Sequence, residues 1–421
     1  MKTKKKIYDA SRPPVRVIYF LLVNFLKLVA VFLMRARLSK DPAIKKLEGP
    51  VIALGNHPSF LDPVYMAMAF WPRHVHFVTS STFYRVRFVR FILQASRTIP
   101  KVQFRTDTQA VKHMLKVVHK NGVLGIYPEG QRSINGSMLS IDGTITRFIK
   151  KTGCSIVIVH VKGAYLSWPR WSDSWIRMGK VFIETKVLLR ANQVMRLDER
   201  SIESKIYEAL SYNEYAWQSK KRIKYYSPAP ARGLHHLCHK CPSCGKDLAM
   251  RSKNFLVACE ACGFSLRVDL RGFLHPLSSD DQKIKLPATP FEWHIWQVNQ
   301  MVDQFSHEGY TLEQKAELQV VNKKAGKFQR LSHGKISFDE QGIMFTSDAN
   351  EPVCHKKFPV LNRGGFIASF GKHFELVLAD EVYRFLPDLG QSVILFADAI
   401  RAVQIIRSQD SNSCVAETIS E

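Results

Sequence analysis

The sequence predicts an α/β fold in which a mostly parallel sheet is flanked by helices. Short apolar runs typical of buried strands alternate with helical patterns, with strand candidates at 51–54, 74–78, 123–127 and 155–161 and helix candidates at 61–70 and 108–119. Strands separated by helices of this length are typical of βαβ units and therefore of a parallel sheet. Two close pairs of cysteines and a region of short β patterns follow this part of the chain.

The charge is high and unevenly distributed. The net charge is +25 on a chain that is 46% hydrophobic and contains 26 Phe and 7 Trp. This composition indicates a folded protein rather than a disordered basic tail. Residues 279–421 contain 15 Lys and Arg against 19 Asp and Glu, so the positive excess lies in the preceding part of the chain. We therefore expect that part to meet a polyanionic partner.

The N-terminal segment 17–34 is apolar except for Asn24 and Lys27, and basic residues flank it on both sides. As a helix it would be about 27 Å long, which is marginal for a hydrocarbon core of about 30 Å. No small-residue cleavage site follows it, which argues against a signal peptide. We expect a helix half-sunk in an anionic leaflet, and a single spanning helix is the alternative.

At 421 residues the chain is too long for one ordinary core. Pro228, Pro230 and Gly233 are typical of a linker, and 335–347 and 373–387 each alternate apolar and polar residues around an Asp-containing turn. We expect the following segments: a membrane-associated helical segment at 1–48, the α/β domain at 49–215, a linker at 216–234, a cysteine-rich segment at 235–275, a small α+β domain of unknown role at 286–408, and a tail at 409–421.

The first candidate site is Asn56-His57-Pro58-Ser59-Phe60-Leu61-Asp62, where a buried strand leaves through Gly55-Asn56 toward a helix. Open α/β sheets bind their ligands at such positions. On a regular helix the two side chains would lie about 140° apart, so their contact requires an irregular turn, which Pro58 favours. Asp62 would then orient His57 as a general base.

The second candidate site is Tyr127-Pro128-Glu129-Gly130-Gln131-Arg132-Ser133, which again follows a buried strand. Gly130 allows close approach of the backbone to a ligand, and the planar guanidinium of Arg132 suits a phosphate. A turn with a solvated Arg is the structural alternative for this motif alone.

Together the two motifs resemble those of the glycerolipid acyltransferase family, which includes 1-acylglycerol-3-phosphate acyltransferases. That family has His, four residues and Asp, here HPSFLD, followed about seventy residues later by Pro-Glu-Gly-Thr-Arg-Ser, here PEGQRS with Gln131 in place of Thr. Its phosphate-binding segment is most similar to 99–105, without the usual preceding Gly, and its apolar fourth motif is similar to 156–163, with Ile158 at the Pro position. The resemblance covers roughly residues 17–190.

The resemblance implies a direct acyl transfer in phospholipid biosynthesis. His57, oriented by Asp62, would deprotonate the hydroxyl of a lysophospholipid such as 1-acylglycerol-3-phosphate, and that hydroxyl would attack the thioester of acyl-CoA or acyl-ACP. Arg132, with Arg105 or Lys101, would hold the acceptor phosphate. Glu129 would contact the glycerol or order the loop. Cys154 is expected to be a core residue rather than a nucleophile.

The third candidate site is a metal centre. Cys241 and Cys244 form one pair, Cys259 and Cys262 form another, and each pair is closed by a Gly that permits a left-handed turn. This pattern predicts a zinc ribbon with structural Zn2+, because four thiolates leave no open position for substrate. Nearby candidates to replace a ligand are Cys238, His235, His236 and His239. Clustered cysteines also favour a reducing compartment, so the chain is expected at the cytoplasmic face of a membrane.

Two other functions compete with this interpretation. The acceptor of the acyl group can be another lysolipid or a glycolipid. Alternatively, the charge and the ribbon would suit a membrane-binding or nucleic-acid-binding protein whose acyltransferase domain is inactive. A nucleic-acid partner does not explain the apolar N-terminus and is not expected.

Overall fold

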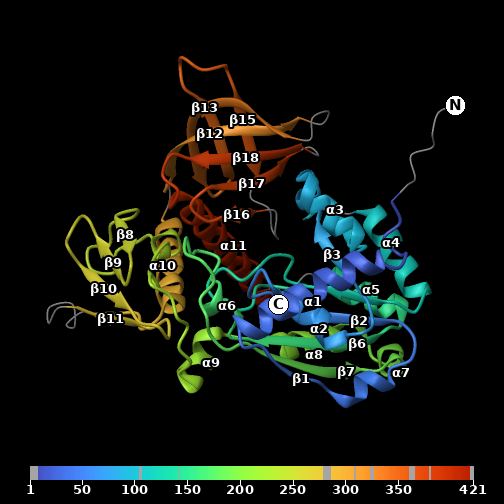
Figure 1. Ribbon diagram of the computed structural model, residues 1–421. Helices are drawn as coiled ribbons and strands as arrows, with labels where there is room; N and C mark the ends of the chain where they lie inside the picture. Colours follow the sequence, from blue (N-terminus) through green and yellow to red (C-terminus); the bar gives the residue numbers. More distant parts are fainter. Residues whose placement is uncertain are drawn as a thin grey trace. The chain divides into compact units, whose positions relative to one another are not determined.

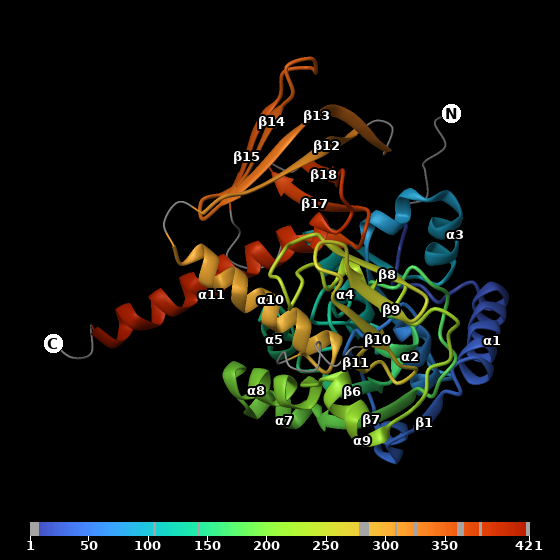
Figure 2. The same ribbon diagram turned by 90° about the vertical axis from the view of Figure 1, so that its left-hand side faces the viewer.

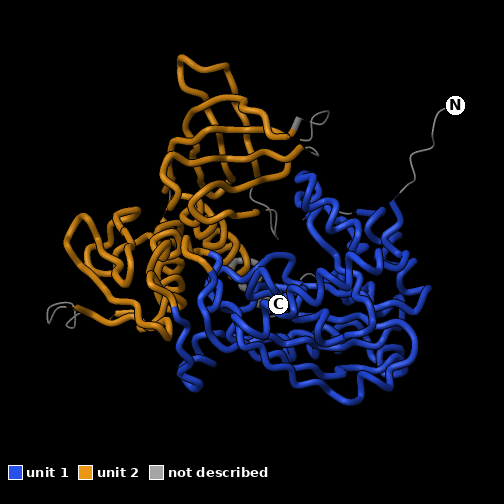
Figure 3. The backbone as a smooth tube through the Cα atoms, in the orientation of Figure 1, with its two compact units in different colours: residues 1–170, 176–226 blue, residues 171–175, 227–421 orange. Residues whose placement is uncertain are grey.

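The computed structural model describes residues 8–103, 107–141, 143–277, 286–307, 310–322, 327–359, 366–378 and 381–417. The chain divides into two compact units, which Figure 3 shows in different colours. Unit 1 comprises residues 1–170 and 176–226, and unit 2 comprises residues 171–175 and 227–421.

Unit 1 is built on a seven-stranded sheet with the order β1-β7-β6-β2-β5-β3-β4 (Figure 1). All neighbouring strands pair in parallel except β6 and β7, which are antiparallel. The predicted sheet, dominated by parallel strands, is therefore confirmed. The strands are β1 (Arg37–Ser39), β2 (Val51–Gly55), β3 (Val75–Ser80), β4 (Ile99–Lys101), β5 (Val123–Ile126), β6 (Ser155–Lys162) and β7 (Phe182–Leu189).

Two apolar clusters cover the two faces of this sheet. Alternate residues of the central strands point to opposite faces, as the period of two in a strand requires. Ile52 and Leu54 pack with α4 (Thr108–His119), α5 (Thr144–Thr152) and α8 (Glu199–Leu210). Val51 and Ala53 pack with α2 (Asp62–Phe70) on the other face. The remaining helices of unit 1 are α1 (Arg16–Phe32), α3 (Arg87–Ala95), α6 (Ala164–Ser167), α7 (Ala191–Arg196) and α9 (Glu214–Lys221).

The apolar N-terminal segment forms α1, a helix of 17 residues. It buries Val23 and Ala30, and its apolar side chains at Phe20, Leu21 and Phe25 are exposed. In the part of the chain that the structure describes, no helix is long and apolar enough to cross a membrane.

The segment 216–234, expected as a linker, is structured. Helix α9 extends to Lys221, and the side chains of Tyr225, Ala231 and Leu234 are buried. The hydroxyl of Tyr225 donates a hydrogen bond of 3.0 Å to the carbonyl of Lys180. The boundary between the two compact units, at residues 226 and 227, lies within this segment.

Unit 2 contains the cysteine-rich segment and the C-terminal region together. The former carries a four-stranded antiparallel sheet of β8 (Met250–Lys253), β9 (Leu256–Cys259), β10 (Ser265–Val268) and β11 (Leu274–Pro276). The C-terminal region carries a seven-stranded antiparallel sheet of order β15-β14-β13-β12-β18-β17-β16. In sequence, this sheet follows α10 (Pro290–Phe305) and precedes α11 (Ser392–Glu417). Its strands are β12 (Leu312–Asn322), β13 (Lys327–Asp339), β14 (Gly342–Ser347), β15 (His355–Pro359), β16 (Ile367–Ser369), β17 (His373–Leu378) and β18 (Glu381–Pro387).

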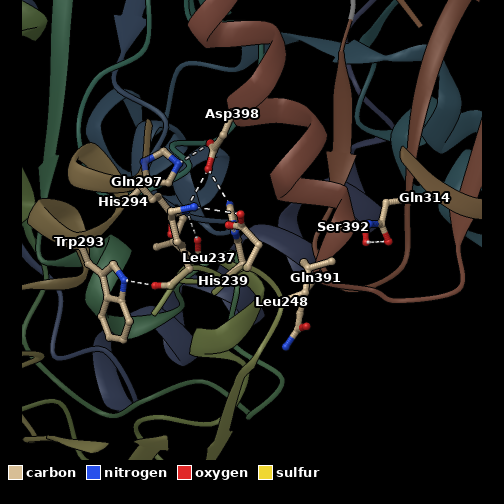
Figure 4. Close-up of polar contacts among 12 residues, drawn as sticks. Leu237, His239, Leu248, Trp293, His294, Gln297, Gln314, Gln391, Ser392 and Asp398 are labelled. Atoms are coloured by element: carbon tan, nitrogen blue, oxygen red, sulfur yellow. Dashed lines mark hydrogen bonds and ion pairs between the residues drawn. The ribbon is translucent and has the colours of Figure 1, made fainter. Parts of the chain in front are cut away.

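A buried carboxylate joins the parts of unit 2. Asp398 of α11 lies 3.1 Å from His239 Nε2 and 2.8 Å from His294 Nε2, and it accepts a hydrogen bond of 2.8 Å from Gln297 Nε2 (Figure 4). Burial alone would raise the pKa of the Asp398 carboxyl, but the facing His294 and His239 rings hold that pKa well below its usual range. Figure 2 shows α10 and α11, which this contact joins, from a second side.

Asp398→Asn should destabilise unit 2 by about 3–5 kcal/mol, because a neutral amide leaves buried ring nitrogens without an ionised acceptor. Hydrogen exchange of the backbone amides in α10 and α11 measures this loss. Asp303→Asn, at an exposed position of α10, is the matched control and should change little. Equal exchange rates in the two variants would contradict the role given to Asp398.

Candidate active site and metal centre

The two sequence motifs of unit 1 meet at one edge of its sheet. His57 follows β2 and Glu129 follows β5, and these strands are parallel neighbours paired from Val51↔Val123 to Leu54↔Ile126. Their carboxyl ends therefore lie together, where open α/β sheets place their ligands. The connection is direct, because Ser133 N donates to the His57 carbonyl at 2.8 Å.

The predicted contact between His57 and Asp62 is present, with 2.7 Å between Nδ1 and Oδ2. Residues 56–61 form an irregular turn, and α2 begins at Asp62, followed by Pro63. Ser59 closes this turn: its backbone N–H donates to Asp62 Oδ2 and its hydroxyl to Asp62 Oδ1, each at 2.8 Å. The side chain of Asp62 is fully buried, whereas that of His57 is 20% exposed.

This geometry fixes the tautomer of His57. An ionised carboxylate only accepts hydrogen bonds, so Nδ1 carries the proton and Nε2 keeps its lone pair. Among the described residues, Nε2 has no hydrogen-bonding partner. A basic nitrogen on a partly exposed ring, oriented by a buried carboxylate, can accept a proton from a bound hydroxyl group.

A tyrosine supports the imidazole ring. The rings of His57 and Tyr127 are stacked, with centroids 4.3 Å apart and planes inclined by 19°. A Cβ atom on Gly55 would lie 2.9 Å from Tyr127 Cε1, so this close packing requires glycine at position 55. The stack restricts the ring plane of His57, while Asp62 restricts rotation within that plane.

Glu129 holds the backbone of the site in place rather than lining the site. Its Oε1 accepts the His57 backbone N–H at 2.9 Å, and its Oε2 accepts the Leu139 backbone N–H at 2.8 Å. The carboxyl is buried, and this burial raises its pKa to about 7, although the two N–H donors oppose the shift. Of the two roles expected for Glu129, the contacts match the ordering of the loop.

Gly130 is exposed on this loop, and Arg132 is partly buried. Gly130 has φ +70°, and its Cα faces open space. The Arg132 guanidinium carbon lies 5.5 Å from the centre of the Phe60 ring, and burial lowers the pKa of Arg132. Behind it, Arg170 Nη1 donates to the Arg132 carbonyl at 2.9 Å. Burial lowers the pKa of Arg170 to about 9, and the charge of Arg132 adds to this effect.

Lys101 ends the edge strand β4 and is partly buried. Two residues later, Gln103 Nε2 donates to the Gly130 carbonyl at 2.8 Å and its Oε1 accepts from Ser80 Oγ at 2.9 Å. The segment that follows Lys101 is therefore attached to the Gly130 turn. Arg105, the other candidate for phosphate binding, lies outside the described residues.

Four contributors to the site were given no role from the sequence, namely Ser59, Gln103, Tyr127 and Arg170. Ser59 and Tyr127 stand inside or next to the two motifs, so their positions were available as a signal. Gln103 and Arg170 carry no such signal, because their contacts depend on how distant loops meet.

The predicted metal ligands come together in unit 2. The sulfur atoms of Cys241, Cys244, Cys259 and Cys262 all lie within 4.8 Å of one another. Cys241 and Cys262 are 3.7 Å apart, and Cys244 and Cys259 are 3.9 Å apart. A tetrahedron with Zn–S bonds of about 2.3 Å has an edge of about 3.8 Å, so the four thiols fit a zinc ion.

Both cysteine pairs have the same backbone turn. Gly245 N donates to the Cys241 carbonyl at 2.9 Å and Gly263 N donates to the Cys259 carbonyl at 3.0 Å, and both glycines have positive φ. The nearby candidates are engaged elsewhere: His235 contacts Ser252, His236 contacts Asp173, and the Cys238 thiol faces the Pro290 carbonyl. Among the residues that the structure describes, Cys241, Cys244, Cys259 and Cys262 are therefore the group that could hold a metal.

The purified chain should contain about one equivalent of zinc, as measured by elemental analysis. The Cys259→Ser variant should lose this zinc, because structural sites need all four ligands. Chelation should raise hydrogen exchange in β8–β10 and leave α2 and β2 unchanged, since unit 1 has its own core. Cys354→Ser, outside the cluster, is the control. Full zinc content in Cys259→Ser would refute the assignment.

Comparisons with known proteins give one family match and matches to solved structures. Residues 35–162 match the model of the family described as Acyltransferase. Among solved structures, the chain is similar to the 1-acyl-sn-glycerophosphate (LPA) acyltransferase PlsC from Thermotoga maritima, with 16% identity, a TM-score of 0.39 and coverage of 54% of this chain and 86% of that chain. It is also similar to the Ran binding domain of Nup2 from Ashbya gossypii, with 14% identity, a TM-score of 0.19 and coverage of 22% of this chain and 94% of that chain.

Proposed function

We propose that this chain, an acyltransferase, moves a fatty acyl group from acyl-CoA or acyl-ACP to the hydroxyl of a lysophospholipid such as 1-acylglycerol-3-phosphate. The observation that carries the proposal is the 2.7 Å contact between His57 Nδ1 and the buried Asp62 carboxylate. It lies beside a loop that presents Arg132, a cation suited to a phosphate.

The proposed step is a direct transfer. His57 Nε2 takes the proton of the acceptor hydroxyl as the oxygen attacks the thioester carbonyl carbon. The new ester bond forms, the C–S bond breaks, and the thiolate leaves with the electron pair and then receives the proton. Asp62 supports this step by stabilising the imidazolium that forms during the attack. The Tyr127 ring, stacked on His57, supports the same cation through its electron-rich face.

The acceptor phosphate is assigned to Arg132, together with Lys101 and Arg105. Arg132 provides a fork of donors, and Arg170 anchors the carbonyl of the same residue. Burial lowers the pKa of Arg132, which means that its charge lacks full solvation. An incoming phosphate would supply the compensating negative charge.

The substrates of such a transfer are membrane lipids, so we place the chain at the cytoplasmic face of an anionic membrane. The exposed side chains of α1 support a monotopic association: they include Val17, Phe20, Leu21, Phe25, Leu28 and Phe32. Lys27 and the flanking basic residues would add attraction to anionic headgroups. Zinc at the four-cysteine cluster is given a structural role, since four thiolates leave no position for substrate.

His57→Ala should lower acyl transfer to a lysophospholipid by at least about 10²-fold, because the general base is lost. The rate of acylation of 1-acylglycerol-3-phosphate by acyl-CoA measures the effect, and circular dichroism checks the fold. The matched control is His119→Ala, at an exposed end of α4. Activity within a few-fold of the unaltered chain would rule out the proposed mechanism.

Arg132→Ala should lower kcat/KM for acceptors that carry a free phosphate at least about tenfold more than for acceptors that do not. The reason is that charge-assisted hydrogen bonds to the phosphate are lost. The measurement compares lysophosphatidic acid with monoacylglycerol as acceptors. Arg147→Ala, on the exposed side of α5, should leave both unchanged. An equal loss for both acceptors would show that Arg132 supports the loop only.

A further inference from the structure

Helix α3 exposes an apolar surface next to the active site. Of its nine residues, all described by the structure, only Ala95 is buried. Phe88 is 72% exposed and Phe91 is 57% exposed, and their spacing of three places them on one side of the helix. Val86 and Phe83, 57% and 45% exposed, continue the surface before the helix. We call Phe83, Val86, Phe88 and Phe91 the α3 patch.

This patch lies in a segment without negative charge. Between Asp62 and Asp107 the sequence contains no Asp or Glu, and it contains seven cations: Arg73, Arg85, Arg87, Arg90, Arg97, Lys101 and Arg105. Arg87 and Arg90 are exposed on α3 itself. Phenylalanine and arginine side chains on one short surface helix are the combination that binds the interface of an anionic bilayer.

The patch is continuous with the catalytic loop. Phe60, three residues after His57, is 51% exposed, and its ring centroid lies 6.4 Å from that of Phe83. On its other sides, Phe60 contacts Trp168 at 5.8 Å and the Arg132 guanidinium at 5.5 Å. Exposed aromatic surface therefore extends from α3 to the residues assigned to the acceptor.

The C-terminal end of α3 is also tied to the chain just before α1. Val15 N donates to the Ala95 carbonyl at 3.0 Å, and Arg97 Nε donates to the Pro13 carbonyl at 3.3 Å. The end of α3 is thus attached to the chain immediately before α1. A bilayer bound by the exposed side chains of α1 would therefore lie close to the end of α3.

We propose that the α3 patch is a second docking surface for an anionic lipid bilayer, distinct from α1. Phe88 and Phe91 insert below the headgroups, and Arg87 and Arg90 contact the lipid phosphates. This docking places Phe60 and His57 at headgroup depth. The acceptor then reaches His57 without leaving the membrane, a consequence that rests on the function proposed above. A second copy of the chain is a poorer occupant, because two such basic patches would repel each other.

The test compares the full chain with Phe88→Ser/Phe91→Ser, using vesicles of phosphatidylcholine and phosphatidylglycerol in equal amounts. The matched control is Met195→Ser/Tyr207→Ser, which removes two apolar side chains of α7 and α8 that are 61% and 55% exposed. Vesicle partition, hydrogen exchange of residues 83–95 with and without vesicles, and acyl transfer are measured. The acceptor is presented either in vesicles or as a short-chain monomer below its micellar concentration.

If the α3 patch docks on the bilayer, vesicles should slow hydrogen exchange of the backbone amides of residues 83–95 in the unaltered chain. Phe88→Ser/Phe91→Ser should partition at least about tenfold more weakly, because two Phe side chains no longer leave water. Its transfer to vesicle acceptor should fall in parallel, while transfer to the monomeric acceptor and the control variant stay unchanged. Arg87→Gln should weaken partition on the anionic vesicles and leave partition on pure phosphatidylcholine vesicles unchanged.

Two results would overturn the docking surface. One is unchanged exchange in 83–95 on vesicles together with unchanged partition of the Phe88→Ser/Phe91→Ser variant. The other is self-association in the absence of lipid that this variant abolishes, which would make the patch an interface between copies. Vesicle protection of 83–95 in a chain that acylates no lysophospholipid would leave the docking surface standing and refute the proposed function instead.

Discussion

The candidate active site depends on the buried carboxylate of Asp62. Five residues separate it from His57, a spacing that places two side chains on different sides of a regular helix. The carboxylate accepts hydrogen bonds from the Ser59 N–H, the Ser59 hydroxyl and His57 Nδ1, and these three contacts stabilise the irregular turn before α2. One buried charge thus shapes the loop and sets the tautomer of the base. Glu129 complements it by fixing the His57 backbone to the neighbouring loop.

Much of unit 1 could be predicted because local signals and fold agree there. The run Val51–Leu54 is apolar on both faces, as a central parallel strand requires, and the structure has β2 at Val51–Gly55. The expected helix at 108–119 forms α4 within the same bounds. The contact between His57 and Asp62 followed from the position of the pair after a strand. Arg170 and Gln103 could not be found in this way, since their partners lie in loops that only the fold brings near.

Unit 2 shows where sequence patterns carry less information. The cysteine spacing predicted the four-sulfur cluster, because the geometry of each turn that carries a cysteine pair depends on residues adjacent in sequence. The placement of the ribbon with the C-terminal region in one compact unit was not predicted. It depends on His239, Asp398 and His294, three polar residues far apart in sequence that meet out of water. Such a network has no periodicity, and each residue taken alone resembles an ordinary surface position.

The claim that Asp62 orients His57 as the base is tested most directly by the rate of acyl transfer in Asp62→Asn. The amide nearly keeps the shape of the carboxylate, but it no longer fixes the proton on Nδ1 or stabilises the imidazolium. We expect kcat to fall by about 10²–10⁴-fold, with the fold retained and acceptor binding nearly unchanged. A rate within a few-fold of the unaltered chain would contradict this claim and would require a different base.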